Sequence, residues 1–151
     1  MSDLSILHFT GDNVTGDPLI IRNEVFVKEQ GVAAEIEFDG LDSSSEHFVA
    51  FLGTEAVAEA RVRIPYESLG HGASAIIEKV AVLGKHRKKG IGDSLMLHIV
   101  KNLESRPGVK SANLECPEYL MGFFRNVGFI PDRNFLDAPD VNNRIMYRPI
   151  H

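Results

Sequence analysis

Positive charge and glycine are concentrated in residues 77–92, IEKVAVLGKHRKKGIG, where an apolar run leads into a basic turn. The basic and glycine residues of this turn are Arg87, Lys88, Lys89, Gly90 and Gly92. A helix that begins here presents unpaired N–H groups and the positive end of its dipole, and glycine leaves space for a pyrophosphate. The glycines match neither a P-loop nor the GxGxxG fingerprint. The turn is therefore predicted to bind phosphate, with a solvated charged turn as the alternative.

A carboxylate stands in an otherwise apolar row just before that turn. Alternation along a strand at 74–83 gives one face four residues, Ile76, Glu78, Val80 and Val82. Partial burial in such a row would raise the pKa of Glu78 toward the range in which a carboxyl group exchanges protons near neutral pH. A cross-strand ion pair with Arg61 or Arg63 is the alternative explanation for this carboxylate.

The histidines and the single cysteine give no pattern typical of a metal site. The histidines are scattered, at His8, His47, His71, His86, His98 and His151. Asp39, Asp42 and His47 could be imagined as ligands, but we interpret them as anchors of a loop or as contacts of an acceptor. Cys116 excludes an intrachain disulfide and a multi-cysteine zinc site, and is interpreted as a packed structural residue. We therefore expect no metal cofactor.

Composition describes an ordinary soluble globular protein. The chain has 151 residues, 44% of them hydrophobic and 25% charged, which predicts one domain over residues 1–151. Sixteen Lys and Arg against 21 Asp and Glu give a formal net charge of −5, which argues against a nucleic-acid-binding surface built on residues 85–89. No apolar run approaches the roughly 20 residues that span a bilayer, and the first residues do not resemble a secretion signal. We expect a cytoplasmic protein without membrane or nucleic-acid partners.

Hydrophobic periodicity predicts a mixture of helices and strands. After a short apolar stretch around 4–9, strands are predicted at 46–52, 55–64, 74–83, 111–115, near Phe129 and at 144–149, and helices at 17–30, 90–105 and about 117–128. Gly53 and Thr54 suit a hairpin turn, and the strand at 55–64 is predicted to have one buried and one polar face. Residues 32–45 are predicted to form an acidic, polar loop. This order indicates an α+β fold with a largely antiparallel sheet.

Three ordered segments resemble the GNAT superfamily of acyl-CoA N-acyltransferases over most of the chain. Arg87-x-x-Gly90-x-Gly92, after Val80-Ala81-Val82, closely resembles its acetyl-CoA motif. The segment FFRNVGF at 123–129 resembles its FYxxxGF motif. The segment RNEVFVKEQ at 22–30, followed by Asp39, Asp42 and His47, resembles a bacterial subgroup of acetyltransferases with a VFxxEQ helix.

The resemblance implies the GNAT fold, a splayed central sheet flanked by helices, with acetyl-CoA as cosubstrate and direct attack by an amine in a ternary complex. It implies binding of the cosubstrate by Val80, Ala81, Val82, Arg87, Lys88, Lys89, Gly90, Ile91, Gly92 and Phe124. Glu29 and Gln30 would line the pocket of a small-molecule or peptide amine, and a homodimer is possible. Glu78 is the candidate general base, since an alkylamine with a reference pKa of about 10.4 must lose a proton before it attacks.

One departure from the family pattern concerns proton donation. Phe124 occupies the place of the tyrosine that usually serves as general acid, and phenylalanine has no proton to donate. Tyr119, five positions earlier on the predicted helix, is expected to face elsewhere. The departure leaves two hypotheses, an N-acetyltransferase and a catalytically weak module that binds acyl-CoA or has a regulatory role.

Overall fold

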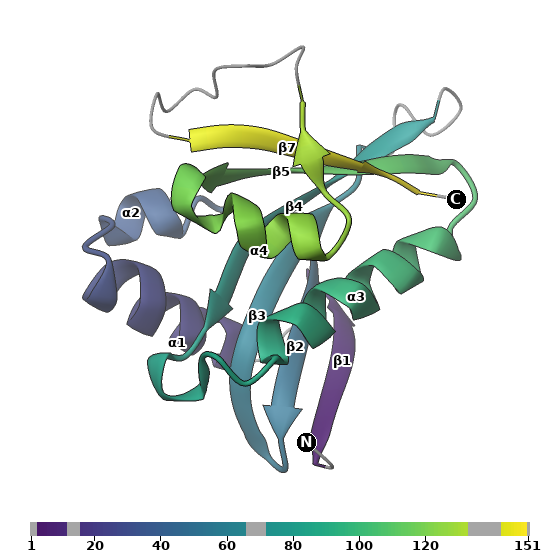
Figure 1. Ribbon diagram of the computed structural model, residues 1–151. Helices are drawn as coiled ribbons and strands as arrows, with labels where there is room; N and C mark the ends of the chain where they lie inside the picture. The colour runs from purple at the N-terminus through teal and green to yellow at the C-terminus, as the bar shows by residue number, and fades with distance from the viewer. Residues whose placement is uncertain (1–2, 12–15, 66–71, 133–142, 151) are drawn as a thin grey trace.

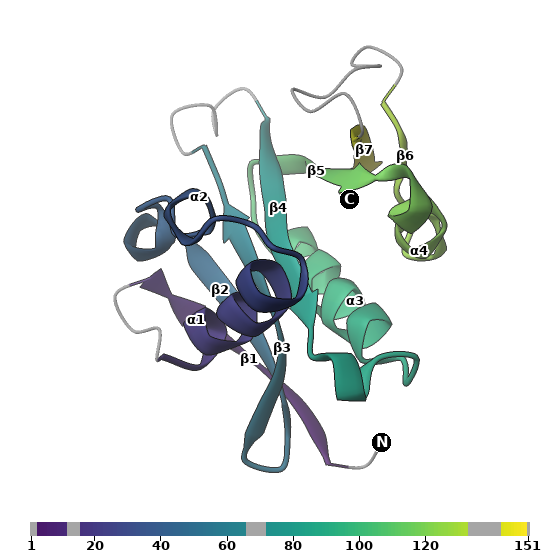
Figure 2. The ribbon, with the colours of Figure 1, turned by 90° about the vertical axis from the view of Figure 1, so that its left-hand side faces the viewer.

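The computed structural model describes residues 3–11, 16–65, 72–132 and 143–150, which build a sheet with helices on both faces (Figures 1 and 2). The strands are β1 (Leu4–Thr10), β2 (Glu46–Leu52), β3 (Glu55–Arg63), β4 (Ala73–Val82), β5 (Val109–Pro117), β6 (Ile130–Pro131) and β7 (Asn143–Pro149). Their order in the sheet is β1-β2-β3-β4-β5-β7-β6, and β4 with β5 is a parallel pair among antiparallel neighbours. The predicted α+β class and mostly antiparallel sheet are confirmed.

The helices divide between the two faces of the sheet (Figure 2). They are α1 (Gly16–Arg22), the π-helix η2 (Asn23–Glu29), α2 (Ala34–Glu37), α3 (Ile91–Glu104) and α4 (Met121–Asn126), with 3-10 turns η3 (Asp42–Ser44), η5 (Gly84–His86) and η6 (Glu118–Leu120). The predicted helix at 90–105 is confirmed, and its residues Ile91, Leu95, Ile99 and Leu103 are buried in the main core. The loop predicted at 32–45 instead contains α2 and η3.

The first predicted helix has the expected extent but a different second half. Residues 23–29 form a π-helix, in which the hydrogen bonds run five residues back, as from the N–H of Gln30 to the carbonyl oxygen of Val25. In this wider spiral, residues four and five positions apart share a face. Val25, Glu29 and Gln30 therefore face the same side of the helix.

Strands β4 and β5 separate partway along their length. Their paired residues run from Ala73 with Val109 to Ile76 with Asn113, and beyond that point β5 is paired with β7. Figure 2 shows the two strands diverging after this short parallel contact. The separation opens the sheet beside the last residues of β4.

A β-bulge in β4 changes which residues share a face. Lys79 has φ 55, and the register with β3 shifts there, so that Arg61 pairs with Glu78 but Glu59 pairs with Ala81. Val80 and Val82 consequently pack against the core on the α3 side, whereas Glu78 lies on the other face with Arg61. The predicted row of Ile76, Glu78, Val80 and Val82 on one face is therefore wrong, because strict alternation ends at the bulge.

The predicted polar face of β3 is not solvent exposed. Glu59 has 0% and Arg61 has 1% relative exposure. Helix α1 packs on β3, and its Arg22, also at 0%, joins the same buried charges. A two-residue period in the sequence identifies the two faces of a strand. It does not reveal that helices cover the polar face as well as the apolar one.

Candidate functional site

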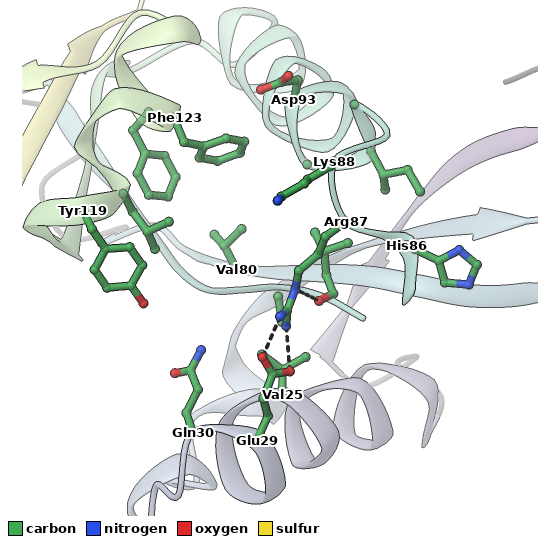
Figure 3. Close-up of a pocket in the computed structure, with 17 residues that line it drawn as sticks. Val25, Glu29, Gln30, Val80, His86, Arg87, Lys88, Asp93, Tyr119 and Phe123 are labelled. Carbon is green, nitrogen blue, oxygen red and sulfur yellow. Dashed lines mark hydrogen bonds and ion pairs between the residues drawn. The ribbon is translucent and has the colours of Figure 1, made fainter. Parts of the chain in front are cut away.

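A pocket of about 590 Å³ opens where β4 and β5 separate. Its walls come from the end of β4, the turn before α3, the first turn of α3, η6 with α4, and η2 (Figure 3). Nine of the predicted cosubstrate residues line it, namely Val80, Ala81, Val82, Arg87, Lys88, Gly90, Ile91, Gly92 and Phe124. Lys89 does not line the pocket and is exposed. Glu29 and Gln30, predicted to contact the acceptor, line the wall that η2 contributes.

The turn before α3 leaves the N-terminus of the helix open toward the pocket. Gly90 precedes the first helical residue with φ 79, and no side chain caps this end of α3. A Cβ at Gly92 would lie 3.1 Å from Cζ of Phe123, so glycine allows α3 to approach α4 closely. Uncapped N–H groups next to Lys88 fit the pyrophosphate of a CoA thioester.

The side chain of Arg87 extends across the pocket toward the wall that carries Glu29 (Figure 3). Its Nε donates a hydrogen bond to the carbonyl oxygen of Val82 at 2.9 Å. Its Nη1 and Nη2 donate to the two carboxylate oxygens of Glu29 at 2.5 and 2.8 Å. The hydrogen bond from Arg87 lowers the pKa of Glu29, and the same contact raises the pKa of Arg87. Arg87, predicted to bind phosphate, and Glu29, predicted to contact the acceptor, are thus bound to each other.

Glu78 lies outside the pocket lining and is held by two arginines. Arg61 Nε donates to its Oε2 at 2.6 Å, and Arg63 donates from Nε and Nη2 at 3.0 and 2.9 Å. Burial opposes ionisation of Glu78, but hydrogen bonds from Arg63 and Arg61 and the charge of Arg61 outweigh it and lower the pKa. The expected rise in the pKa of Glu78 is therefore wrong, and the ion pair that the sequence left open as an alternative is present.

The acidic segment before β2 is held by Arg61 of β3 and by Arg22 of α1. Asp39 accepts two hydrogen bonds from Arg61, each at 2.8 Å, and Asp42 accepts one from Arg22 at 2.5 Å. His47 Nε2 lies 3.0 Å from the carbonyl oxygen of Asp42. These contacts confirm Asp39, Asp42 and His47 as loop anchors.

The remaining predictions concern metal binding and the single thiol. Within the described ranges, no group of three or more His, Cys, Asp or Glu is arranged to hold a metal ion, and His71 and His151 lie outside those ranges. Cys116 is buried, and burial, with a smaller contribution from Glu115, raises its thiol pKa to about 11. This confirms a structural rather than a reactive cysteine. In the part of the chain that is described, no helix has the length and apolar character needed to cross a bilayer.

Tyr119 lines the pocket, contrary to the expectation that it faces elsewhere. The helix begins at Met121, and Tyr119 belongs to the preceding 3-10 turn, so counting residues along one α-helix gave the wrong direction. Figure 3 shows its ring at the mouth of the pocket, with the hydroxyl directed toward the wall that carries Gln30 and Glu29. Phe124, in contrast, is buried, with its ring against Phe123 and Phe129.

Sequence reasoning also missed other lining residues. Val25, His86, Asp93, Leu120 and Phe123 belong to the pocket. Asp93 could have been found by extending the phosphate-binding turn into the first turn of α3. The others depend on where η2, η5 and α4 sit in space, for which the local sequence carries no signal.

Comparison with known proteins agrees with this geometry. Residues 19–129 match the Acetyltransferase (GNAT) family. An uncharacterized N-acetyltransferase of Bacillus subtilis (strain 168), YjcF, is 34% identical over 124 residues, which cover 81% of this chain and 84% of that protein. The crystal structure of Escherichia coli ElaA has a TM-score of 0.82 at 23% identity and covers 96% of this chain and 99% of that one. An Elizabethkingia anophelis GNAT family acetyltransferase with acetyl-CoA bound has a TM-score of 0.74 at 15% identity and covers 99% and 100%. The chain therefore belongs to the GNAT acetyltransferase family and has the fold of its acyl-CoA N-acyltransferases.

Proposed function

We propose that the protein transfers an acetyl group from acetyl-CoA to an amine, by direct attack of the amine on the thioester within a ternary complex. The observation that carries this proposal is the pocket itself, which joins an uncapped helix N-terminus to the opening between β4 and β5. Family membership supports acyl transfer to nitrogen, and the acetyl-CoA in the Elizabethkingia anophelis structure supports the choice of acyl donor.

The phosphate-binding role belongs to the turn at residues 87–92. The N–H groups of Ile91 and Gly92 and the side chain of Lys88 would hold the pyrophosphate, and Lys89, outside the lining, would add charge nearby. The backbone of Val80, Ala81 and Val82 would bind the pantetheine arm, because β5 has separated from β4 by these residues. Phe124 would contribute apolar contact beside Phe123.

The reaction needs one proton donor, for the leaving thiolate, and one proton acceptor, for the amine. When the carbon–sulfur bond breaks, the CoA thiolate leaves and takes a proton, and the Tyr119 hydroxyl is the proton donor that we propose in place of the missing tyrosine. Its ring is 78% exposed, so solvent can restore the proton. The amine gives up a proton to solvent water before it attacks or as it attacks, and its nitrogen forms the new bond to the acetyl carbon. The general-base role of Glu78 stays a prediction, and its contacts with Arg61 and Arg63 favour the ion-pair role.

The test has two parts, carried out on the full chain. Calorimetric titration with acetyl-CoA is expected to show saturable binding, and a thiol reagent is expected to detect CoA release when amines are added. The amine panel contains spermidine, lysine amide and peptides with a free N-terminus. Binding of acetyl-CoA without release of CoA in the presence of any of these amines would favour the weak acyl-CoA-binding module. The absence of a hydroxyl at Phe124 argues for that module. No binding would contradict both functions. A cytoplasmic location, a homodimer and a single domain over 1–151 stay predictions.

A further inference from the structure

Glu29 and Arg87 bring two functions of the pocket into direct contact. The two residues are 58 positions apart in the sequence, on the η2 wall and in the turn before α3. The guanidinium of Arg87 faces the carboxylate of Glu29 with two parallel N–H···O bonds, at 2.5 and 2.8 Å. Its Nε donates to the carbonyl oxygen of Val82. Three of the five N–H groups of the guanidinium are therefore bound within the protein, and Glu29 occupies the pair that forms the bidentate fork.

The chemistry of this contact is the chemistry of phosphate binding. A guanidinium presents a planar fork that fits a carboxylate or a phosphate in the same bidentate way. A pyrophosphate at the N-terminus of α3 carries more negative charge than one carboxylate and is held by backbone N–H groups as well. Glu29 and the pyrophosphate therefore compete for the same guanidinium.

The exposure of the pair makes exchange easy. Arg87 is 38% and Glu29 is 45% exposed, and exposed ion pairs contribute little free energy. Glu29 is also the last residue of η2, so its side chain lies at the end of the helix. Among the described residues, the hydrogen bonds of the Glu29 carboxylate all go to Arg87.

We propose that Glu29 is a competitor for Arg87 that the pyrophosphate of the acyl donor displaces, and that the freed carboxylate then binds a positively charged group of the acceptor. This inference rests on the proposed function. It makes the acyl donor bind before the acceptor, because the acceptor site is neutralised until Arg87 is withdrawn. It also names the acceptor class, an amine that carries a further positive charge.

A titration of acetyl-CoA into variants tests the competition. Glu29→Gln removes the carboxylate charge, and acetyl-CoA is expected to bind about two- to fivefold more tightly, the range that an exposed ion pair supports. Glu24→Gln is the matched control, since Glu24 is exposed on the same helix, bonds Lys28 and does not line the pocket. Its affinity for acetyl-CoA is expected to equal that of the unmodified protein.

A double-mutant cycle assigns the effect to Arg87. In the background of Arg87→Gln, the change Glu29→Gln is expected to leave acetyl-CoA affinity unaltered, because no guanidinium remains to be contested. Equal or weaker binding by Glu29→Gln in the native background overturns the competition. An equal gain in acetyl-CoA affinity from Glu29→Gln in the presence and in the absence of Arg87 also overturns it. Failure of the unmodified protein to bind acetyl-CoA would instead refute the proposed function on which the inference rests.

The acceptor half is tested in the CoA-release assay. For spermidine or lysine amide at saturating acetyl-CoA, Glu29→Gln is expected to raise the KM at least severalfold and to change kcat much less. Activity confined to amines without a second positive charge, or an unchanged KM, overturns this half. If no amine causes release of CoA, the transfer reaction itself is contradicted.

Discussion

Two arginines decide the protonation state of Glu78. Because Arg61 and Arg63 lower its pKa, the carboxylate is ionised throughout the neutral range and cannot produce a limb near neutrality in a pH–rate profile. Glu78→Gln is expected to leave the shape of that profile unchanged. It should cost about 1 to 3 kcal/mol of stability, because Arg61 at 1% exposure loses a charged partner.

The measurements for Glu78→Gln are urea unfolding and the pH dependence of kcat/KM. Glu55→Gln serves as the control, because Glu55 pairs with Lys85 at the surface and its loss should change stability little. Loss of the acidic limb with unchanged stability would restore the general-base role to Glu78.

Tyr119 lines the pocket and is the residue that we propose as proton donor to the leaving thiolate. Tyr119→Phe is expected to lower kcat about tenfold or more and to leave the KM for acetyl-CoA nearly unchanged, because the hydroxyl acts as the bond breaks. Adding Phe124→Tyr to this variant should restore part of kcat, since it returns a phenol to the usual place in the family motif. Tyr147→Phe in β7, outside the pocket lining, is the control. An unchanged kcat in Tyr119→Phe would assign the proton to water.

At the level of elements, the start of α3 depends on the backbone conformation of Gly90. A Cβ there would meet nothing within 4 Å, so a substitution acts through its φ of 79 and not through a clash. A β-branched residue in this conformation costs on the order of 1 to 3 kcal/mol, and relief of that strain reorients the first N–H groups of α3.

Gly90→Val is therefore expected to weaken acetyl-CoA binding at least tenfold in calorimetry. Gly53→Val is the matched control, because Gly53 has φ 61, also has open space around a Cβ, and turns the β2–β3 hairpin away from the pocket lining. It should lower the free energy of unfolding and leave the affinity unchanged. Equal loss of affinity in both variants would show that the effect comes from general destabilisation.

For the whole molecule, the charges buried between α1 and the sheet control how stability depends on pH. His47 Nδ1 and Glu59 Oε1 lie 3.7 Å apart, and both residues have 0% exposure. Burial raises the pKa of Glu59 to about 6. Burial opposes protonation of His47, but the nearby Glu59 outweighs it and raises the pKa of that histidine.

The folded protein thus holds protons at Glu59 and His47 that the unfolded chain releases at the same pH. The stability that Glu59 contributes is lost as pH rises from about 4.5 to about 6, and the stability that His47 contributes is lost as pH rises above about 6.5. Arginine contacts lower the pKa of Asp39, Asp42, Glu46 and Glu78 despite burial, so their contribution is lost as pH falls below about 4. Urea unfolding from pH 4 to 8 is expected to give maximal stability near pH 4 to 5, below the range in which folded Glu59 loses its proton. Glu59→Gln should remove the decline between about pH 4.5 and 6, and it should flatten the decline above pH 6.5 because His47 loses its charged neighbour. An unaltered decline would contradict the role of this pair.

Local sequence patterns predict the features that depend on neighbouring residues. The alternation of 46–52 and 55–64 around Gly53 and Thr54 predicts a hairpin, and the four-residue spacing after Gly90 predicts α3, because both patterns arise from backbone geometry within a few residues. The basic turn with its glycines was placed at the N-terminus of α3 for the same reason, and it lies on the pocket.

Features that depend on residues distant in the chain could be seen only in the folded protein. The bulge at Lys79 separates Glu78 from Val80, and Arg61 and Arg63 then set the ionisation of Glu78. Burial of Glu59 requires α1 from an earlier part of the chain, and the contact between Arg87 and Glu29 spans 58 positions. The physical reason is common to all of them, because desolvation and charge pairing act through space, and residue order along the chain does not specify that distance.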